Sequence, residues 1–427
     1  MSGVMPPREL LVGSFHAALA AADPLKIVPT HLPAPPKGRT LVVGAGKAAA
    51  AMALAVEQQW PASAPLDGMV ITRYQHGLLT NRITVIEAGH PVPDESGETA
   101  TREILRRVRA LTPNDLLLVL VSGGGSSLLS LPVEGISMAD LKLTTRELLL
   151  SGAPIQDMNT VRKHLSAIQG GRLAVACRAP MLALVISDVT GDEPTHIASG
   201  PCAPDPSTFD DALDILKRYG VHAPAAVTDH LNRGAHGKVA ETPKPGDHVF
   251  RQVENRVIAT AHASLEAGAR YLADHGIRAV ILGDSVTGEA REVAKVYAAL
   301  ARETRSTGQP WPPPVALISG GECTVSVRGK GRGGRCTEFL LSLALELNAA
   351  ENMHALACDT DGIDGSEDNA GAVLAPDSLQ RALAKQINAR ALLDGNDAYT
   401  FFNTLDDLIV TGPTRTNVND YRVVLVL

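Results

Sequence analysis

Residues 115–126 read DLLLVLVSGGGS, in which an unbroken apolar run (116–121) is followed by a serine and three glycines. A continuous apolar run of this length is typical of a strand buried on both faces of a parallel sheet. Such sheets bind ligands beyond the carboxyl ends of their strands. Similar runs, most followed by glycine and a helical segment, are TLVVGAG (40–46), GMVIT (68–72), MLALVISDV (181–189), RVIAT (256–260), RAVILGD (278–284), PVALISGG (314–321) and HALACDTDG (354–362). The sequence therefore predicts an α/β fold.

A chain of 427 residues is longer than one hydrophobic core usually supports, so more than one domain is expected. We place the boundary in the Pro- and Gly-rich stretch 235–250, which gives domains of residues 1–245 and 250–427. A net charge of -7 and an aromatic content of 3% argue against a nucleic-acid binder.

The five cysteines are scattered and never spaced CxxC, which predicts a reducing compartment without disulfides or a standard zinc site. No apolar run approaches the roughly 18 residues of a membrane span. The stretch LLVGSFHAALAAA (10–22) follows Glu9 and contains His16, and its apolar spacing suits an amphipathic helix. We therefore expect a cytoplasmic protein with no membrane partner.

The first candidate site is VVGAGKAAAAM (42–52). Gly44 and Gly46 formally match a dinucleotide fingerprint, but no acidic ribose ligand follows, since GMVIT is followed by Arg73; NADP stays open through that arginine. Lys47 stands at the start of a helix, where a cation opposes the helix dipole unless an anion neutralises it. A solvated lysine is the simpler alternative; beside two glycines, an anion or substrate ligand is favoured.

A second candidate site is the SGGGSS loop. Its glycines and hydroxyls suit a phosphate, although no GK[ST] follows and this is not a Walker loop. A tight structural turn is the alternative. The expected nucleotide-binding residues here are Ser122, Gly123, Gly124, Gly125 and Ser126.

A third candidate is SGGECTVSVRGKGRGGRCTE (319–338), which concentrates positive charge in an acidic protein. Its glycines let backbone N–H groups approach an anion closely. Arg332 and Arg335 can grip phosphate or carboxylate oxygens in a planar fork, whereas Lys330 offers a point charge. The expected nucleotide-binding residues are Lys330, Gly331 and Gly333.

Two acidic segments supply candidate bases and metal ligands. ISDVTGDEPTHIASGP (186–201) places a carboxylate at a strand end, and CDTDGIDGSED (358–368) is rich in oxygen donors without matching the spacing of an EF-hand. Surface Asp-Gly turns are the alternative explanation. The candidates are Asp188, Asp192, Asp359 and Asp361.

Together these motifs resemble the two-domain glycerate 2-kinase family, whose C-terminal part is the MOFRL domain. The resemblance covers nearly the whole chain and rests on GAGKAA, SGGGSSLL, NTVRKHLSAIQGGRLA, SDVTGDEPTHIASGP, SGGE…GKGRGGR, DTDGIDG…NAGA and TGPTRTNV. It implies a Rossmann-like N-terminal domain, a smaller α/β C-terminal domain with its core at about 312–420, and an active site in the cleft between them. Departures from the family pattern are Gln169 for lysine, Cys336-Thr337 for Asn-Gln and Arg415 for glycine.

The resemblance implies an ATP- and Mg²⁺-dependent kinase that phosphorylates the 2-hydroxyl of D-glycerate, with Lys47 and Arg335 as catalytic residues. We add Asp188 and Asp361 as candidate catalytic carboxylates, and Asp192 and Asp359 as candidate metal ligands. Backbone N–H groups of 122–127 and 329–334 would hold the polyphosphate. Some family members carry the label hydroxypyruvate reductase, so an NAD(P)H-dependent reductase is the alternative. A homodimer stays open.

Overall fold

The computed structural model describes residues 5–427, which form two compact units with a sheet in each. The first unit is Pro24–Ile258, and the second combines residues 5–23 with Ala259–Leu427. These units differ from the expected ranges in two ways. The division falls after 258 rather than between 245 and 250, because the strand Val253–Ala259 completes the first sheet. The N-terminal helix packs in the second unit rather than the first.

The first unit contains a six-stranded sheet in the order β3-β2-β1-β4-β5-β6. The strands are β1 (Thr40–Ala45), β2 (Leu66–Arg73), β3 (Ile83–Ala88), β4 (Leu116–Val121), β5 (Met181–Ile186) and β6 (Val253–Ala259). The pairs from β3 through β5 are parallel. This is the Rossmann order, and its direction reverses between β1 and β4. The expected Rossmann-like fold is therefore confirmed, with a ligand crevice expected beside those two strands.

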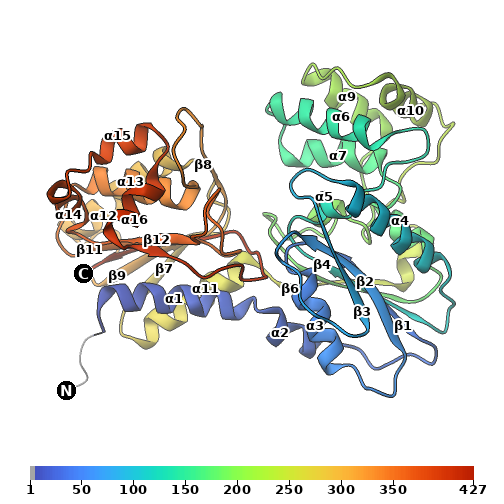
Figure 1. Ribbon diagram of the computed structural model, residues 1–427, viewed down its shortest axis with the longest axis horizontal. Coiled ribbons are helices and arrows are strands. Elements are labelled where there is room, and N and C mark those ends of the chain that lie inside the picture. The colour runs from blue at the N-terminus through green and yellow to red at the C-terminus, as the bar shows by residue number, and fades with distance from the viewer. Residues whose placement is uncertain (1–4) are drawn as a thin grey trace. The chain divides into compact units, whose positions relative to one another are not determined.

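The helices of the first unit form two groups. Near the sheet lie α2 (Pro24–Ile27), α3 (Ala49–Gln59), α4 (Glu95–Arg109), α5 (Gly125–Leu128) and α8 (Arg172–Ala176), with the short 3-10 turns η1 (Val28–His31), η2 (Ile197–Ser199) and η3 (His248–Gln252). Four others, α6 (Met138–Leu150), α7 (Ile155–Leu165), α9 (Phe209–Arg218) and α10 (Ala225–Ala235), bury a separate apolar cluster (Figure 1). Capping boxes at Ser137 and Thr208 fix the starts of α6 and α9.

The second unit contains a mixed sheet in the order β13-β12-β11-β14-β9-β7. Its strands are β7 (Arg278–Gly283), β9 (Val315–Ser319), β11 (Met353–Asp359), β12 (Gly371–Leu374), β13 (Leu408–Ile409) and β14 (Asp420–Val426). Only the pair β7–β9 is parallel among these described strands. A two-stranded ribbon joins β8 (Gly288–Glu289) to β10 (Cys323–Thr324).

Both faces of this mixed sheet are covered by helices. In β14, Val424 and Val426 belong to the apolar cluster of α12 (Ala290–Thr307) and α13 (Arg335–Leu347), while Val423 and Leu425 belong to that of α1 (Pro7–Ala21) and α11 (Ala261–Asp274). Successive strand residues point to opposite faces, so this alternation defines a sheet buried on both sides. The small helices α14 (Ser378–Ala384), α15 (Ala389–Asp394) and α16 (Ala398–Leu405) lie on the α13 side (Figure 1).

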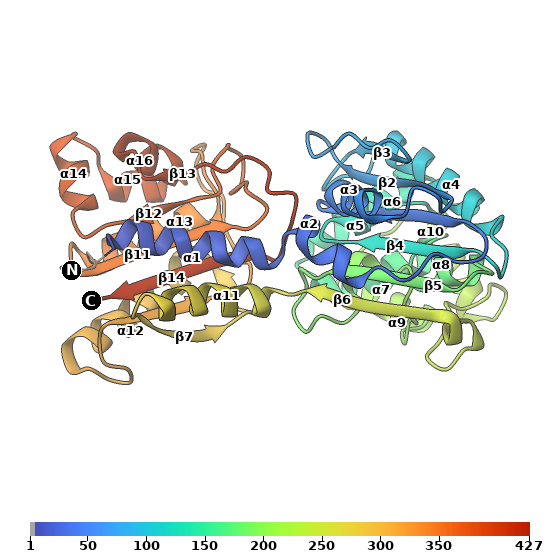
Figure 2. The same cartoon turned by 90° about the horizontal axis from the view of Figure 1, so that it is seen from below.

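Helix α1 is the N-terminal helix expected from residues 10–22, and it lies alongside α11 (Figure 2). Its buried residues Leu10, Leu11 and Phe15 pack with Leu265 and Tyr421. Within residues 5–427 no single helix is long and apolar enough to cross a membrane, although α1 taken jointly with the following bent segment meets the length and composition criterion.

Candidate active site

The loops after β1 and β4 meet at the point where the strand order of the first sheet reverses. The N–H of Lys47 donates to the carbonyl of Gly123 (2.9 Å), and the N–H of Ala48 donates to Ser122 Oγ (3.0 Å). The N–H of Ser122 donates back to Ala45 (3.2 Å). The structure therefore brings together the GAGK and SGGGSS motifs, which the sequence identified separately.

Gly44 and Gly46 are explained by this close approach. A Cβ on Gly44 would lie 2.0 Å from the carbonyl oxygen of Leu120, and one on Gly46 would lie 2.1 Å from Ser122 Oγ. Gly46 also has φ +141°, a conformation that side-chain-bearing residues rarely adopt. The packing of β1 against β4 thus accounts for both glycines without a dinucleotide.

Three backbone N–H groups of the SGGGSS loop, those of Gly123, Gly124 and Ser126, make no hydrogen bond within residues 5–427. The N–H groups of Gly125 and Ser127 donate inside the loop, to Ser122 and Gly124, whereas those three have no such partner. Adjacent N–H groups of this kind bind anions when they converge. They lie beside Lys47, whose Cγ is 3.6 Å from the position of a Cβ on Gly124.

His90 lies at this site, although from the sequence it is expected to be only a surface histidine. Its Nε2 lies 2.8 Å from the position that a Cβ on Gly124 would take, so its ring packs directly over the loop. Gly124 has φ +81°, which again favours glycine. The signal was a lone histidine in a proline-rich loop, AGHPVPDE, and such a residue looks no different from a surface histidine in the sequence.

A chain of hydroxyl and amide groups extends from the far end of the loop. Ser126 Oγ is 2.9 Å from Ser199 Oγ, and Ser199 donates to Asn159 Oδ1 (3.2 Å). Ala198 and Ser199 have φ +51° and +57°, which costs about 1–3 kcal/mol each for non-glycine residues. Strained residues persist where the surroundings fix them, and they gather at functional sites.

Gln169, which stands where the family usually has a lysine, holds the same loop through hydrogen bonds to its backbone. Its Nε2 donates to the carbonyls of Ser126 (2.8 Å) and Leu129 (2.9 Å), and its side chain is buried. A lysine ammonium is also a donor, so the substitution preserves the kind of contact although it changes the charge.

Asp188 and Asp192 lie in the loop after β5, next to the end of β4 in the sheet, and both are half-buried. Asp192 adopts φ +55°. These are hard oxygen donors on the strand edge that carries the SGGGSS loop. Mg²⁺ needs only one or two protein carboxylates when phosphates supply further ligands, so this pair is compatible with such an ion.

In the second unit, Arg335 is the first residue of α13 and lies among three carboxylates. Its Nε donates to Asp420 (2.8 Å), its Nη2 to Asp359 (2.7 Å), and its Nη1 is 3.2 Å from Glu322. Burial acts to lower the pKa of Arg335, but the charges of Asp420, Asp359 and Glu322 outweigh it and raise that pKa. Asp359 and Asp420 are buried, whereas the Glu322 side chain is 57% exposed.

The acidic turn after β11 serves the protein itself. Asp359 accepts from the N–H of Asp361 (3.0 Å) as well as from Arg335, and Asp361 Oδ1 accepts from Ile363 (2.9 Å). The carboxylate of Asp364 caps the start of α13 through the N–H groups of Cys336 and Thr337. Within residues 5–427 no group of three His, Cys, Asp or Glu side chains is arranged to hold a metal. Asp359 therefore fits a partner of Arg335 better than the metal ligand we expected.

The glycine- and arginine-rich loop of residues 327–334 is hydrogen-bonded to the segment before α16. Asn396 Oδ1 accepts from the N–H groups of Arg328 (2.6 Å) and Gly329 (3.0 Å), and its Nδ2 donates to Glu338 (2.8 Å). The N–H of Gly331 donates to Gly395 (3.1 Å). The N–H of Gly331 is therefore already hydrogen-bonded within the protein, whereas we expected it to donate to a phosphate.

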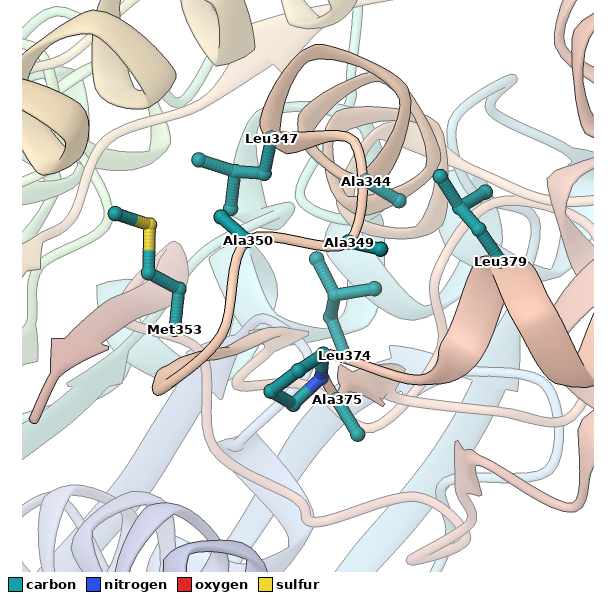
Figure 3. A pocket seen from close by; sticks show the side chains of 9 residues that line it. Ala344, Leu347, Ala349, Ala350, Met353, Leu374, Ala375 and Leu379 are labelled. Atoms are coloured by element: carbon teal, nitrogen blue, oxygen red, sulfur yellow. The ribbon is translucent and has the colours of Figure 1, made fainter.

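A cavity of about 400 Å³ lies against this loop. Its lining includes apolar side chains and the Arg335 guanidinium, and also the polar side chains of Glu338, Ser366 and Asn396. A second hollow, at the end of α13, is lined by apolar residues (Figure 3) and holds only about 10 Å³. That is room for one water molecule, so it is not a ligand site.

The expected site residues thus form two sets. Those of the first unit are Lys47, Gly44, Gly46, Ser122–Ser126, Asp188 and Asp192, and those of the second are Arg335, Lys330, Gly331, Gly333, Asp359 and Asp361. That the two sets meet across a cleft stays a prediction.

A Rossmann-ordered sheet with a glycine-rich loop at its switch point defines an α/β protein of the nucleotide-binding fold class, and comparison with known proteins gives the family. Residues 10–232 match a domain of unknown function, DUF4147, and residues 315–420 match the MOFRL family. The chain belongs to the two-domain glycerate 2-kinase family with a C-terminal MOFRL domain, and it is an enzyme.

Three similar proteins show how far the likeness extends. A D-glycerate 2-kinase from Thermotoga maritima is 37% identical, over 98% of both chains. The crystal structure of the glycerate kinase of that organism superimposes with a TM-score of 0.87 at 36% identity, covering 98% of this chain and 99% of that one. A relative from Agrobacterium vitis is 49% identical over 98% of this chain and 94% of its own, and it carries a provisional assignment as a hydroxypyruvate reductase.

Proposed function

We propose that this enzyme transfers the γ-phosphoryl group of ATP to the 2-hydroxyl of D-glycerate, giving 2-phosphoglycerate and ADP. The observation that carries the proposal is the pair of unpartnered N–H groups of Gly123 and Gly124 beside Lys47. An enzyme that handles a phosphoryl group needs such positive, preorganised groups. The names of the relatives supply the acceptor, since glycerate kinases are similar over nearly the full length.

In this proposal the residues of the first unit position the reacting groups. The N–H groups of Gly123 and Gly124 bind a phosphate oxygen, and the Lys47 ammonium neutralises charge that develops on the transferred group. Asp188 accepts the proton of the 2-hydroxyl while the oxygen–phosphorus bond forms and the bond to ADP breaks. Arg335, oriented by Asp359 and Asp420, binds a further anionic group of the substrates.

Divalent metal enters the proposal at Asp192, in the loop that also carries Asp188, rather than at Asp359. Both oxygens of Asp359 accept hydrogen bonds from the protein, one of them from a guanidinium that repels a cation. When bound with the nucleotide, Mg²⁺ would neutralise phosphate charge. Asp192 at φ +55° is held in a constrained loop suited to a fixed ligand.

Hydroxypyruvate reduction with NAD(P)H is the second candidate, because the Agrobacterium relative is assigned to it. The glycine pair Gly44 and Gly46, which formally suggested a dinucleotide, is accounted for by strand packing. Strand β2 ends at Arg73, so an acidic ribose ligand is missing there. These observations favour the kinase.

One experiment separates the candidates. The protein is incubated with ATP, Mg²⁺ and D-glycerate, the products are identified by ³¹P NMR, and a parallel sample with hydroxypyruvate is followed by NAD(P)H absorbance. We expect 2-phosphoglycerate, its loss on adding a chelator, and no change in absorbance. Formation of 3-phosphoglycerate alone would refute the regiochemistry, and oxidation of the nicotinamide without ADP release would refute the kinase.

A further inference from the structure

Arg162 is a partly buried cation that has no carboxylate partner. It lies on α7 and donates from Nη1 to Asn159 Oδ1 at 3.3 Å. Within residues 5–427 no Asp or Glu oxygen lies within ion-pair distance of its guanidinium. A guanidinium taken out of water is costly unless a charge or strong acceptors compensate it.

The neighbouring basic residues are compensated, which sets Arg162 apart. Lys163 Nζ is 3.2 Å from the buried carboxylate of Asp205, and His164 Nε2 is 2.9 Å from Glu241. Burial lowers the pKa of Arg172, but Asp205 and Glu241 act to raise it. Burial also lowers the pKa of Arg162, with no acidic residue opposing the shift. The basic residues near Arg162 therefore each have an acidic partner in the protein, whereas Arg162 has none among the described residues.

Arg162 is connected to the SGGGSS loop by two further contacts. The oxygen of Asn159 that accepts from Arg162 also accepts from Ser199, and Ser199 in turn contacts Ser126. This hydrogen-bond network fixes the position of Nη1 of Arg162 relative to Ser126 at the far end of the loop. The N–H groups of Gly123 and Gly124, with Lys47, lie at the other end of the same loop.

We propose that Arg162 binds the carboxylate of the acceptor substrate, so that the loop receives the phosphoryl group at its Lys47 end and the organic acid at its Ser126 end. The inference rests on the proposed function and names the group that selects its substrate. A guanidinium matches a carboxylate in a planar two-bond fork, and a free anion supplies the charge that the fold omits. Asn159 is a positioning residue that orients this fork.

The test compares Arg162→Met and Arg162→Lys with a matched control, Arg218→Met. Arg218 also contacts α7, through Asp157, but it is 63% exposed and outside the network. A charge-assisted hydrogen-bonded pair is worth roughly a 10- to 100-fold change, so Arg162→Met should raise KM for D-glycerate by that factor. The KM for ATP should not change. Arg162→Lys should recover part of the loss, because it keeps the charge without the fork.

A neutral analogue provides the decisive readout. The wild-type enzyme should discriminate against D-glyceramide, and Arg162→Met should treat the amide and the acid nearly alike. An unchanged preference for the acid in a folded Arg162→Met, checked by its thermal transition, would overturn the inference. If Arg162→Met does not fold, the same comparison is made with Arg162→Lys, which must then show the weaker preference.

Calorimetric binding separates this inference from the proposed function. D-glycerate, hydroxypyruvate and inorganic phosphate are titrated into the wild type and the variants without nucleotide. If the wild type turns over no glycerate yet binds an organic acid that Arg162→Met does not bind, the proposed kinase function is refuted and the carboxylate-binding role of Arg162 is supported. If no carboxylate binds to the wild type, or if binding survives in Arg162→Met, the role of Arg162 is refuted.

Discussion

Gly46 allows the loop after β1 to lie directly against Ser122 in the loop after β4, since a Cβ on Gly46 would lie 2.1 Å from Ser122 Oγ. Gly46→Ala should therefore strain the backbone at φ +141° and also displace the Ser122 hydroxyl, which accepts a hydrogen bond from the N–H of Ala48. We expect a loss of about 1–3 kcal/mol in the free energy of unfolding and a marked fall in kcat/KM. Gly135→Ala, at φ +89° with open space around it, carries strain alone and serves as the control. Equal activity of the two variants would contradict the proposed contact.

Lys47→Met should lower kcat by about 10²–10³-fold, because a preorganised charge at the transition state is lost. Its thermal transition should stay close to that of the wild type. Lys37→Met removes an exposed lysine just before β1 and should leave kcat unchanged. Near wild-type turnover of Lys47→Met would remove this lysine from the mechanism.

If Arg335 binds an anionic group as proposed, Glu322 should compete with that group, because it already pairs with the guanidinium. The buried carboxylates of Asp359 and Asp420 hold the guanidinium of Arg335, and Glu322 is its exposed partner. An exposed ion pair is worth about 0–1 kcal/mol, so Glu322→Gln should lower KM for an anionic substrate by up to about 5-fold. Asp359→Asn should act in the opposite sense, because it loosens the orientation of Arg335. Steady-state kinetics for ATP and D-glycerate measure both; identical KM values in Glu322→Gln and the wild type would rule out the competition.

Acid stability should depend on Glu241. Partial burial acts to raise its pKa, but hydrogen bonds from His164, Thr242 and Phe209 bring it to about 2. The folded carboxylate therefore resists protonation more than the unfolded one, so its contribution is present above pH 4.5 and is lost as the pH falls toward 2. Urea unfolding at pH 5 and pH 3 should show a smaller difference for Glu241→Gln than for the wild type. The exposed Glu351→Gln should keep the wild-type difference.

Eight strands (β1, β2, β4, β5, β6, β7, β9 and β11) and the two glycine loops were predictable because each leaves a local pattern in the sequence, but β12, β13 and β14 were not among the predicted strands. An apolar run that ends in glycine marks both β4 and β9 without any knowledge of the rest of the chain. The partners of Arg335 leave no such pattern, since Asp359 and Asp420 lie 24 and 85 positions away. Asn396 likewise determines the conformation of a loop nearly 70 residues earlier. What could not be predicted is therefore the contact between distant segments, which decides whether an aspartate holds a metal or an arginine.

The place of α1 has a consequence for the order in which the chain folds during synthesis. The residues that α1 needs for its apolar face, including Leu265 and Tyr421, are made long after it leaves the ribosome. The whole of Pro24–Ile258 is complete before then and has its own core. Helix α1 is therefore translated before the residues that bury it, so its apolar face can be covered only after the first unit is complete.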